Sequence, residues 1–200
     1  PECNEIQPVS VRRLPDGLPP IKPLRSEHQP TADFLTRCCK VFIAAASDLN
    51  AQDAKSGDSD TGSTLAGASR ALIGALNHLP LADHTRLMRA IGQELSQTTG
   101  GSSGVLLAIF FTAAGDAAAS SLPMNAALRA GLARMQEIGG ANLGDRTMVD
   151  ALKPALDELD ISLEAAAKAA RKGAAHTTTL SKANAGHAAY ISPEQLQGQT

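Results

Sequence analysis

The sequence predicts an all-α protein, and three observations lead to this fold class. Alanine and leucine fill almost every apolar stretch, and both residues favour helices. Aromatic residues, which are enriched in strands, make up only 2% of the chain, and tryptophan is absent. No segment alternates apolar and polar residues for long enough to predict a strand. With 43% apolar residues, a chain of 200 residues can build one helical domain with its own core.

The first 30 residues are predicted to form a linker. Most of the 11 prolines lie here, and no helical or strand period persists, as is typical of a stiff connecting segment. We therefore expect a proline-rich interdomain linker over residues 1–30 and a helical domain over residues 31–200. Because the chain begins at Pro1 without a methionine, we expect a fragment, a processed chain or a piece cut from a longer protein, with the upstream partner missing.

The first helix is predicted to follow Thr31, because apolar residues then recur three and four positions apart. These residues are Phe34, Cys38, Val41, Phe42, Ala45 and Leu49. The stretch from Asn50 to Gly62 breaks this pattern with small and acidic residues, so it is predicted to be a loop. A second helix is predicted from about Ser63 to Asn77.

Capping residues mark the next two helices. Asp83 is predicted to cap the third helix, which ends at Gly100 and Gly101. Its apolar stripe consists of Leu87, Ile91 and Leu95. Ser102 or Ser103 is predicted to start the fourth helix, which runs through VLLAIFFTAAG. Because apolar residues occupy nearly all of its faces, this helix should lie at the centre of the domain.

Three further helices complete the prediction. They cover roughly residues 124–138, 147–159 and 162–182. The tail from Asn184 to Thr200 is predicted to end without another helix.

Charge and composition exclude some classes of partner. With a net charge of −2 and a pI of about 6.2, the chain has no broad basic field, so nucleic acid is not expected to bind. The longest apolar stretch, Val105 to Ala114, is too short to cross a bilayer, so no membrane partner is expected.

Two of the three cysteines, Cys38 and Cys39, are neighbours in a helical pattern where a mutual disulfide would be strained. This favours a reduced, cytoplasmic protein.

Three carboxylates gather after the first predicted helix. Asp53, Asp58 and Asp60 lie at positions i, i+5 and i+7 in a loop with flanking glycines. Three converging oxygen ligands suit Mg²⁺, which leaves its other positions to water and substrate phosphate. Aspartate also favours turns and helix caps, so the pattern alone leaves a metal site and a structural loop equally open. An EF-hand is excluded, because twelve residues counted from Asp58 end at Ser69 instead of a glutamate.

The sequence GGSSG, Gly100 to Gly104, immediately precedes the most apolar helix. There, free backbone N–H groups and the positive end of the helix dipole would face an anion together. A flexible turn is the alternative, and it is the commoner meaning of a lone Gly/Ser cluster. The motif is not a Walker loop, because no Gly-Lys-Ser/Thr follows.

Two further motifs are weaker on their own. In GDRTM, Gly144 to Met148, Asp145 is predicted to cap the sixth helix, and Met148 can lie over a flat base or simply be buried. SKANAGHAAY places His187 and the single tyrosine in a turn.

No spacing of serine, histidine and aspartate indicates a hydrolase, and no cluster of cysteine and histidine indicates a zinc site. A carboxylate-held metal together with a phosphate cradle serves phosphoryl transfer.

Together and in this order, LNAQDAKSGDSDTGST, GGSSGVLLAIFFTAAG, GDRTMVDALKPAL and SKANAGHAAY resemble the C-terminal L domain of dihydroxyacetone kinases. The resemblance covers about residues 31 to 197, and the proline-rich opening resembles the connector between the K and L domains of single-chain, ATP-dependent members. It implies a barrel of eight antiparallel helices with the nucleotide at one end. The last of these helices would be missing here, so the domain is expected to be C-terminally short.

The resemblance also implies the ligands and the residues that bind them. Two Mg²⁺ ions would bridge the phosphates of ATP or ADP, held by the three motif aspartates, Asp53, Asp58 and Asp60. The residues matched to phosphate contacts are Thr61, Gly62, Ser63, Thr64, Ser102 and Ser103, and those near the nucleoside are Gly139 and Met148. Dihydroxyacetone would be held covalently on a histidine of the K domain, which this chain does not contain.

One departure from the family concerns His187. Where the family has Gly-Arg-Ala-Ser-Tyr, this sequence has Gly-His-Ala-Ala-Tyr, so an imidazole replaces the guanidinium near the phosphates. The phosphate groups should therefore bind more weakly.

The resemblance implies that the parent protein transfers the γ-phosphate of ATP to dihydroxyacetone and that this chain is inactive without the K domain. A triokinase/FMN cyclase-type relative and a non-catalytic nucleotide-binding scaffold are the alternatives. A homodimer of the full-length enzyme is compatible with either kinase interpretation.

Overall fold

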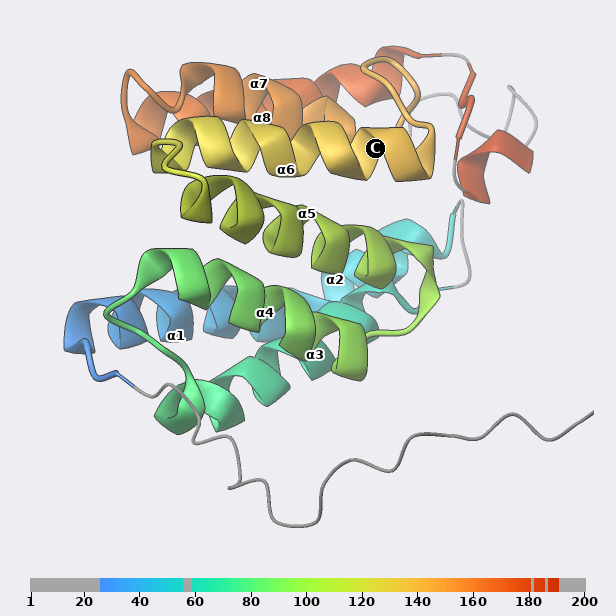
Figure 1. The fold of residues 1–200 in the computed structure, drawn as a ribbon. Coiled ribbons are helices and arrows are strands. Elements are labelled where there is room, and N and C mark those ends of the chain that lie inside the picture. Colours follow the sequence, from blue (N-terminus) through green and yellow to red (C-terminus); the bar gives the residue numbers. More distant parts are fainter. Residues whose placement is uncertain (1–25, 56–58, 181, 186, 191–200) are drawn as a thin grey trace, which may run out of the picture.

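The computed structural model describes residues 26–55, 59–180, 182–185 and 187–190, and this part of the chain is predominantly helical (Figure 1). Its α-helices are α1 (Gln29–Ala44), α2 (Ala46–Asp53), α3 (Thr61–Ala75), α4 (His84–Thr98), α5 (Gly101–Ala119), α6 (Met124–Gly139), α7 (Val149–Glu158) and α8 (Leu163–His176). Its 3₁₀ helices are η1 (Leu76–His78), η2 (Thr177–Thr179) and η3 (His187–Tyr190). The only extended pairing within these ranges is an isolated bridge between Ser26 and Pro80. The predicted all-α fold class is confirmed.

Helices that follow one another in the chain pack side by side. α1 and α2 contact α3, and from α3 to α8 each helix contacts the next. The helices from α4 to α8 run in alternate directions, so the arrangement is antiparallel as predicted (Figure 1). As a result, the start of α5, the end of α6, the start of α7 and the end of α8 lie at one end of the molecule, on the right in Figure 1. The end of α2 and the start of α3 lie at the same end.

The core consists of two clusters of buried side chains, and α5 contributes to both. The first cluster includes Leu87, Ile91 and Leu95 of α4, and the second includes Leu132, Met135, Val149 and Leu156. Leu107 and Phe111 of α5 pack against both clusters. This confirms the prediction that the helix after GGSSG lies at the centre of the domain.

α5 is also the one helix in the described part of the chain that is long and apolar enough, by length and composition, to cross a membrane. The prediction counted only Val105 to Ala114, whereas the helix runs from Gly101 to Ala119. Its position between α4 and α6 accounts for this composition, because a helix packed on more than one side needs apolar residues on more than one face.

The first predicted helix is divided into α1 and α2, so the structure has eight α-helices within the described ranges where the sequence predicts seven. The division, at Ala45, lies beside a close approach of α3. A Cβ atom added to Gly62 would lie 2.0 Å from the carbonyl oxygen of Ala46. The prediction of a loop beginning at Asn50 is wrong by one turn, because α2 continues to Asp53 and bonds there to the start of α3.

The last predicted helix ends at His176, earlier than the predicted residue 182. The hydroxyls of Thr177 and Thr178 donate to the carbonyl oxygens of Ala174 and Ala175. Hydroxyls that bond to preceding carbonyls compete with the helical hydrogen-bond ladder, and the chain continues as the 3₁₀ helix η2. By contrast, the cap predicted at Asp83 is confirmed, because its carboxylate accepts the backbone N–H of Arg86 at 3.0 Å.

The adjacent cysteines of α1 are both free thiols, without the mutual disulfide that their spacing disfavours. Cys39 is buried, and burial raises the pKa of its thiol above 9.0. A buried thiol of this kind stays protonated at neutral pH and behaves as a small apolar side chain, so Cys39 serves packing.

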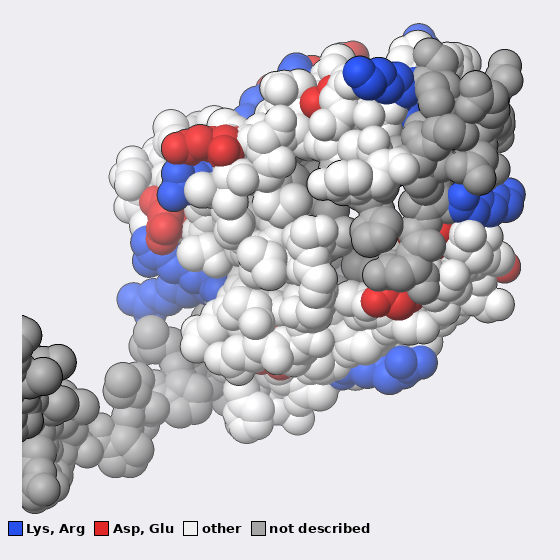
Figure 2. All heavy atoms as spheres, turned by 90° about the vertical axis from the view of Figure 1, so that its right-hand side faces the viewer, with Lys and Arg blue, Asp and Glu red and all other residues white. Residues whose placement is uncertain are grey.

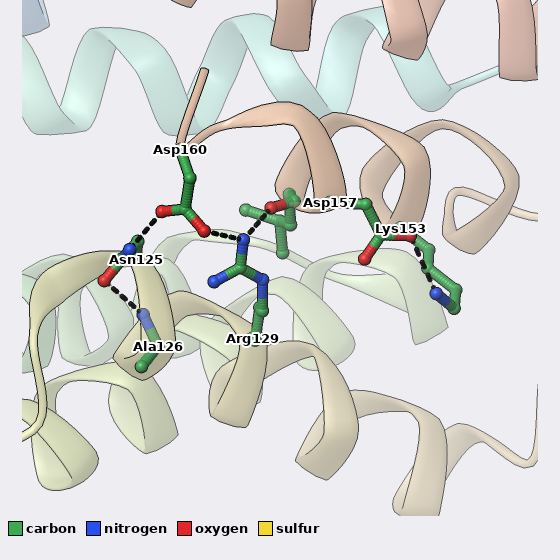
Figure 3. Close-up of polar contacts among 7 residues, drawn as sticks. Asn125, Ala126, Arg129, Lys153, Asp157 and Asp160 are labelled. Carbon is green, nitrogen blue, oxygen red and sulfur yellow. Dashed lines mark hydrogen bonds and ion pairs between the residues drawn. The ribbon is translucent and has the colours of Figure 1, made fainter. Parts of the chain in front are cut away.

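At the end of the molecule where α6 begins and α7 ends, Arg129 of α6 bonds to α7 and to the turn that follows it (Figure 3). Its Nη2 donates to the carbonyl oxygen of Leu156 in α7 at 2.7 Å and to Oδ2 of Asp160, after α7, at 2.6 Å. Asn125 donates to the other carboxylate oxygen of Asp160. The hydrogen bond from Asn125, followed in size by that from Arg129, lowers the pKa of Asp160 below its usual value of 3.8. The cluster therefore ties the start of α6 to the end of α7.

Candidate functional site

A cavity of about 630 Å³ opens at the end of the molecule where α5 and α7 begin. Its walls come from the start of α5, the end of α6, the loop between α6 and α7 and the chain after α8. Figure 2 looks onto this end, whose middle is hollowed and largely uncharged while lysine, arginine and acidic side chains lie toward the edges. Most of the residues that line the cavity are apolar.

Four predicted site residues line this cavity together. Ser102 and Ser103 come from the first turn of α5, Gly139 ends α6, and Met148 immediately precedes α7. They belong to segments far apart in the sequence, so their meeting in one cavity agrees with the prediction that they share a site. Their individual contacts with a ligand stay predictions.

The start of α5 gives the cavity a polar end. The helix begins at Gly101, with Gly100 as its N-cap, one or two residues before the predicted start. The N–H groups of the first turn of a helix have no partner within the helix, and the helix dipole is positive there. With the Ser102 and Ser103 hydroxyls beside them, these N–H groups can receive an anionic ligand group.

The rest of the lining is mostly apolar. Met148 packs against the core cluster that contains Val149, and the side chains of Val105 and Ile138 also reach the cavity. Gly139 lies so close to Leu106 that an added Cβ would be 3.0 Å from one methyl carbon of that leucine. The cavity is therefore suited to a ligand that is anionic at one end and flat and apolar at the other.

Asp53 and Asp60, the two described aspartates of the predicted metal loop, belong to the end of α2 and the start of α3, which lie at the same end of the molecule (Figure 1). Oδ2 of Asp53, the last residue of α2, accepts the backbone N–H groups of Asp60 at 3.0 Å and Thr61 at 3.1 Å. Asn50, one turn earlier, donates to the hydroxyl of Ser63 at 2.8 Å and accepts its backbone N–H at 3.0 Å. Two side chains of α2 thus hold the first turn of α3.

Among the remaining predicted phosphate contacts, Gly62 is buried against α2, while Thr61 and Thr64 are half-buried in the first turn of α3. Neither these residues nor the two described aspartates belong to the cavity lining. Asp58 lies outside the described residues. Within those residues no group of three or more histidine, cysteine, aspartate or glutamate side chains is placed to hold a metal ion. The three-aspartate site, which needs Asp58, therefore stays a prediction.

The loop between α6 and α7 is organised by Asp150, a buried carboxylate that sequence reasoning did not single out. Its Oδ1 accepts the N–H of Gly144 at 2.6 Å, and its Oδ2 accepts the N–H of Thr147 at 2.8 Å. Arg146, between them, has a φ of +56°, a left-handed conformation that costs about 1 kcal/mol or more for a residue with a side chain. The two hydrogen bonds on either side stabilise this conformation.

The predicted cap at Asp145 is wrong, because Met148 is the N-cap of α7. Asp145 instead accepts the N–H of Asn142 at 2.7 Å and the side-chain amide of Asn184 at 2.8 Å. The backbone N–H of Thr147, just before α7, donates to Asp150 and not to Asp145. Asp145 bonds instead to Asn184 in the chain after α8.

Arg146 is the functional candidate that sequence reasoning missed. It lines the cavity, and its Nη1 donates to the carbonyl oxygens of Thr177 at 2.9 Å and Leu180 at 2.7 Å. The only signal in the sequence was its place inside GDRTM. His187, the predicted phosphate contact, begins η3, but its side chain lies outside the described part of the structure.

Comparison with known proteins identifies the family. The chain matches the DAK2 domain model over residues 55–199. It is 45% identical over 205 residues to the dihydroxyacetone kinase of Citrobacter freundii, an alignment that covers 98% of this chain and 37% of that protein. It is 39% identical over 176 residues to the triokinase/FMN cyclase of Mus musculus, covering 81% of this chain and 30% of that protein. The chain belongs to the DAK2 domain family.

Solved structures agree with this assignment. The chain matches the crystal structure of the native dihydroxyacetone kinase of C. freundii with a TM-score of 0.81 and 40% identity, over 97% of this chain and 37% of that chain. It matches the structure of the C. freundii kinase in complex with AMP-PNP and Mg²⁺ with a TM-score of 0.79 and 38% identity, over 96% of this chain and 35% of that chain. The chain spans about a third of the length of the curated relatives it matches.

Proposed function

We propose that this chain is the ATP- and magnesium-binding domain of a dihydroxyacetone kinase and that it presents the γ-phosphate of ATP to dihydroxyacetone held by a separate K domain. The observation that carries the proposal is the cavity, in which Ser102 and Ser103 at a helix start face an apolar wall containing Met148. A kinase of the same family and fold has been crystallised with AMP-PNP and Mg²⁺, which supports a nucleotide as the ligand.

The two ends of the cavity match the two ends of a nucleotide. Phosphate oxygens would accept hydrogen bonds from the N–H groups and hydroxyls at the start of α5. The nucleoside would lie against Met148 beside Gly139, where the close approach of Leu106 leaves no space for a side chain. This arrangement places the phosphates at the start of α5 and the nucleoside at the end of α6 and the start of α7.

Magnesium would be held by Asp53, Asp58 and Asp60. Carboxylate oxygens are the ligands that Mg²⁺ prefers, and the ion keeps positions for phosphate oxygens. The described hydrogen bonds of Asp53 go to Oδ2, so its Oδ1 is available to a cation. We propose two ions, which would neutralise charge on the transferred phosphoryl group.

Phosphoryl transfer depends mainly on positioning and on neutralising charge, so a strong general base in this domain is not required. The residues of this chain would bind and orient ATP, and the acceptor alcohol would come from the K domain. We therefore expect the isolated chain to bind nucleotide without phosphorylating dihydroxyacetone. The 39% identity to a triokinase/FMN cyclase favours that activity as the second candidate for the parent protein.

Calorimetric titration with ATP, in the presence and absence of Mg²⁺, tests the binding function. The natural chain should bind ATP with heat that depends on Mg²⁺. Asp53→Asn removes one ligand charge but keeps an oxygen for the N–H groups of α3, and it should weaken Mg²⁺-dependent binding by about tenfold or more. Asp48→Asn, an exposed position on the same helix, is the matched control and should bind as the natural chain does.

Two results would contradict the proposal. Absence of Mg²⁺-dependent heat with the natural chain would favour a non-catalytic scaffold. Equal affinities in the Asp53 and Asp48 variants, with circular dichroism unchanged in both, would exclude Asp53 from the metal site.

A further inference from the structure

The chain after α8 returns to the cavity and supplies part of its wall. α8 ends at His176, and Ala185 lines the cavity and packs against its core cluster. Ala183 is buried and Ala185 is half-buried, whereas Lys182 is exposed. The cavity therefore has a wall beside Ala185 only when the chain after α8 is held in this position.

Side chains of the α6–α7 loop hold this segment in place. Nη1 of Arg146 donates to two backbone carbonyls, that of Thr177 at 2.9 Å and that of Leu180 at 2.7 Å. Asp145 accepts the side-chain amide of Asn184 at 2.8 Å. The bonded residues are 31 and 34 positions from Arg146 in the sequence, and Asn184 is 39 positions from Asp145.

The chemistry of Arg146 suits this task. Thr177 is the C-cap of α8, where the helix dipole is negative and the last carbonyls lack partners within the helix. A guanidinium is charged at every working pH and presents several N–H donors in a fixed geometry. Its backbone is itself held, because Asp150 accepts the N–H groups of Gly144 and Thr147 on either side. The guanidinium is thereby aimed at the end of α8.

We propose that Arg146 is a positioning residue for the nucleotide: it holds residues 177–180 and 182–185 against the α6–α7 loop, so that Ala185 completes the cavity wall. The proposal rests on the nucleotide-binding function proposed above. Arg146 acts through the segment that it holds, and the affinity for nucleotide depends on that segment.

Four variants test the proposal. Arg146→Met keeps an apolar side chain of similar reach but removes the donors. Arg146→Lys is the conservative variant: the bonds to Thr177 and Leu180 come from one nitrogen, so a single ammonium can donate to the same two carbonyls. Asn184→Ala removes a different tie to the same segment without changing charge. Arg134→Met, which breaks an exposed ion pair with Glu137 on α6, is the matched control.

The first measurement needs no nucleotide: trypsin cleavage after Lys182, followed by mass spectrometry. Loss of the two hydrogen bonds should speed cleavage in Arg146→Met by about tenfold, with smaller increases in Arg146→Lys and Asn184→Ala and none in Arg134→Met. Circular dichroism shows which variants are folded. If Arg146→Met is unfolded, Arg146→Lys and Asn184→Ala carry the test.

The second measurement is the dissociation constant for Mg·ATP at several salt concentrations. Affinity should fall by about tenfold in Arg146→Met, recover in part in Arg146→Lys, and fall less in Asn184→Ala. The dependence on salt should be the same in all variants, because a positioning residue does not neutralise phosphate charge.

Other outcomes would overturn the proposal. Faster cleavage with unchanged affinity would show that the segment is held but does not matter for the nucleotide. Unchanged cleavage with weaker affinity and a reduced salt dependence would show that Arg146 binds phosphate directly. If the natural chain fails to bind Mg·ATP, the proposed function fails, while the cleavage rates still decide whether Arg146 holds the segment.

Discussion

Replacing Gly62 by alanine should separate α2 from α3 and destabilise the domain. The added Cβ would lie 2.0 Å from the carbonyl oxygen of Ala46 and 2.8 Å from Oδ1 of Asn50. Ordinary contact distances are about 3.5 Å, so the two backbones must move apart by roughly 1.5 Å. The obstructing atoms include backbone, which cannot turn aside as a flexible side chain can.

The expected magnitude follows from these contacts. Overpacking of this kind costs about 1–3 kcal/mol. The displacement also weakens the hydrogen bonds from Asn50 and Asp53 to the start of α3, each worth about 1 kcal/mol. The higher helix propensity of alanine offsets up to about 1 kcal/mol. We expect the free energy of unfolding to fall by about 2–4 kcal/mol.

Urea denaturation followed by circular dichroism measures this change. Gly67→Ala is the matched control, because it lies in the same helix and an added Cβ there meets no atom within 4 Å. It should raise the free energy of unfolding by about 0.5–1 kcal/mol. Mg·ATP affinity should fall in Gly62→Ala and stay unchanged in Gly67→Ala. If both variants are equally stabilised, the close approach of α2 and α3 is wrong.

Two further predictions concern the α7–α8 pair and acid stability. Gly173→Ala should lower the free energy of unfolding by about 1–3 kcal/mol in the same assay, because its Cβ would lie 2.0 Å from the carbonyl oxygen of Asp150; stability equal to that of the Gly67 variant would refute this. The carboxylate of Asp160, whose pKa is lowered, contributes stability above pH 3.8 that is lost as the pH falls through its folded-state pKa. Asp160→Asn should therefore be less stable at neutral pH and lose less stability below about pH 4. An acid profile as steep as that of the natural chain would contradict this assignment.

The positions of most helices could be predicted because their signals are local. The carboxylate of Asp83 caps α4 through an N–H group three residues away, and the apolar stretch after GGSSG marks the central helix. The division at Ala45 and the early end of α8 could not be predicted in the same way. The first lies beside the approach of α3 at Gly62, and the second involves threonine hydroxyls that compete with the helical ladder.

The candidate site was predicted in part. Ser102, Ser103, Gly139 and Met148 were matched through the order of the motifs, and the structure brings them to one cavity. Arg146 lies within the motif GDRTM, but the sequence predicted no function for it. Its partners are 31 and 34 residues away, and no spacing in the sequence indicates them.

By itself the sequence determined which segments are helical, which helix is apolar all round, and which motifs occur in which order. Only the tertiary structure decided that the ends of α5, α6 and α8 meet around one cavity and that Asp53 holds the start of α3. It also decided that Arg146 reaches past its own loop to the end of α8. The physical reason is range: helix propensity and capping act within about one turn, whereas these contacts depend on how whole helices pack.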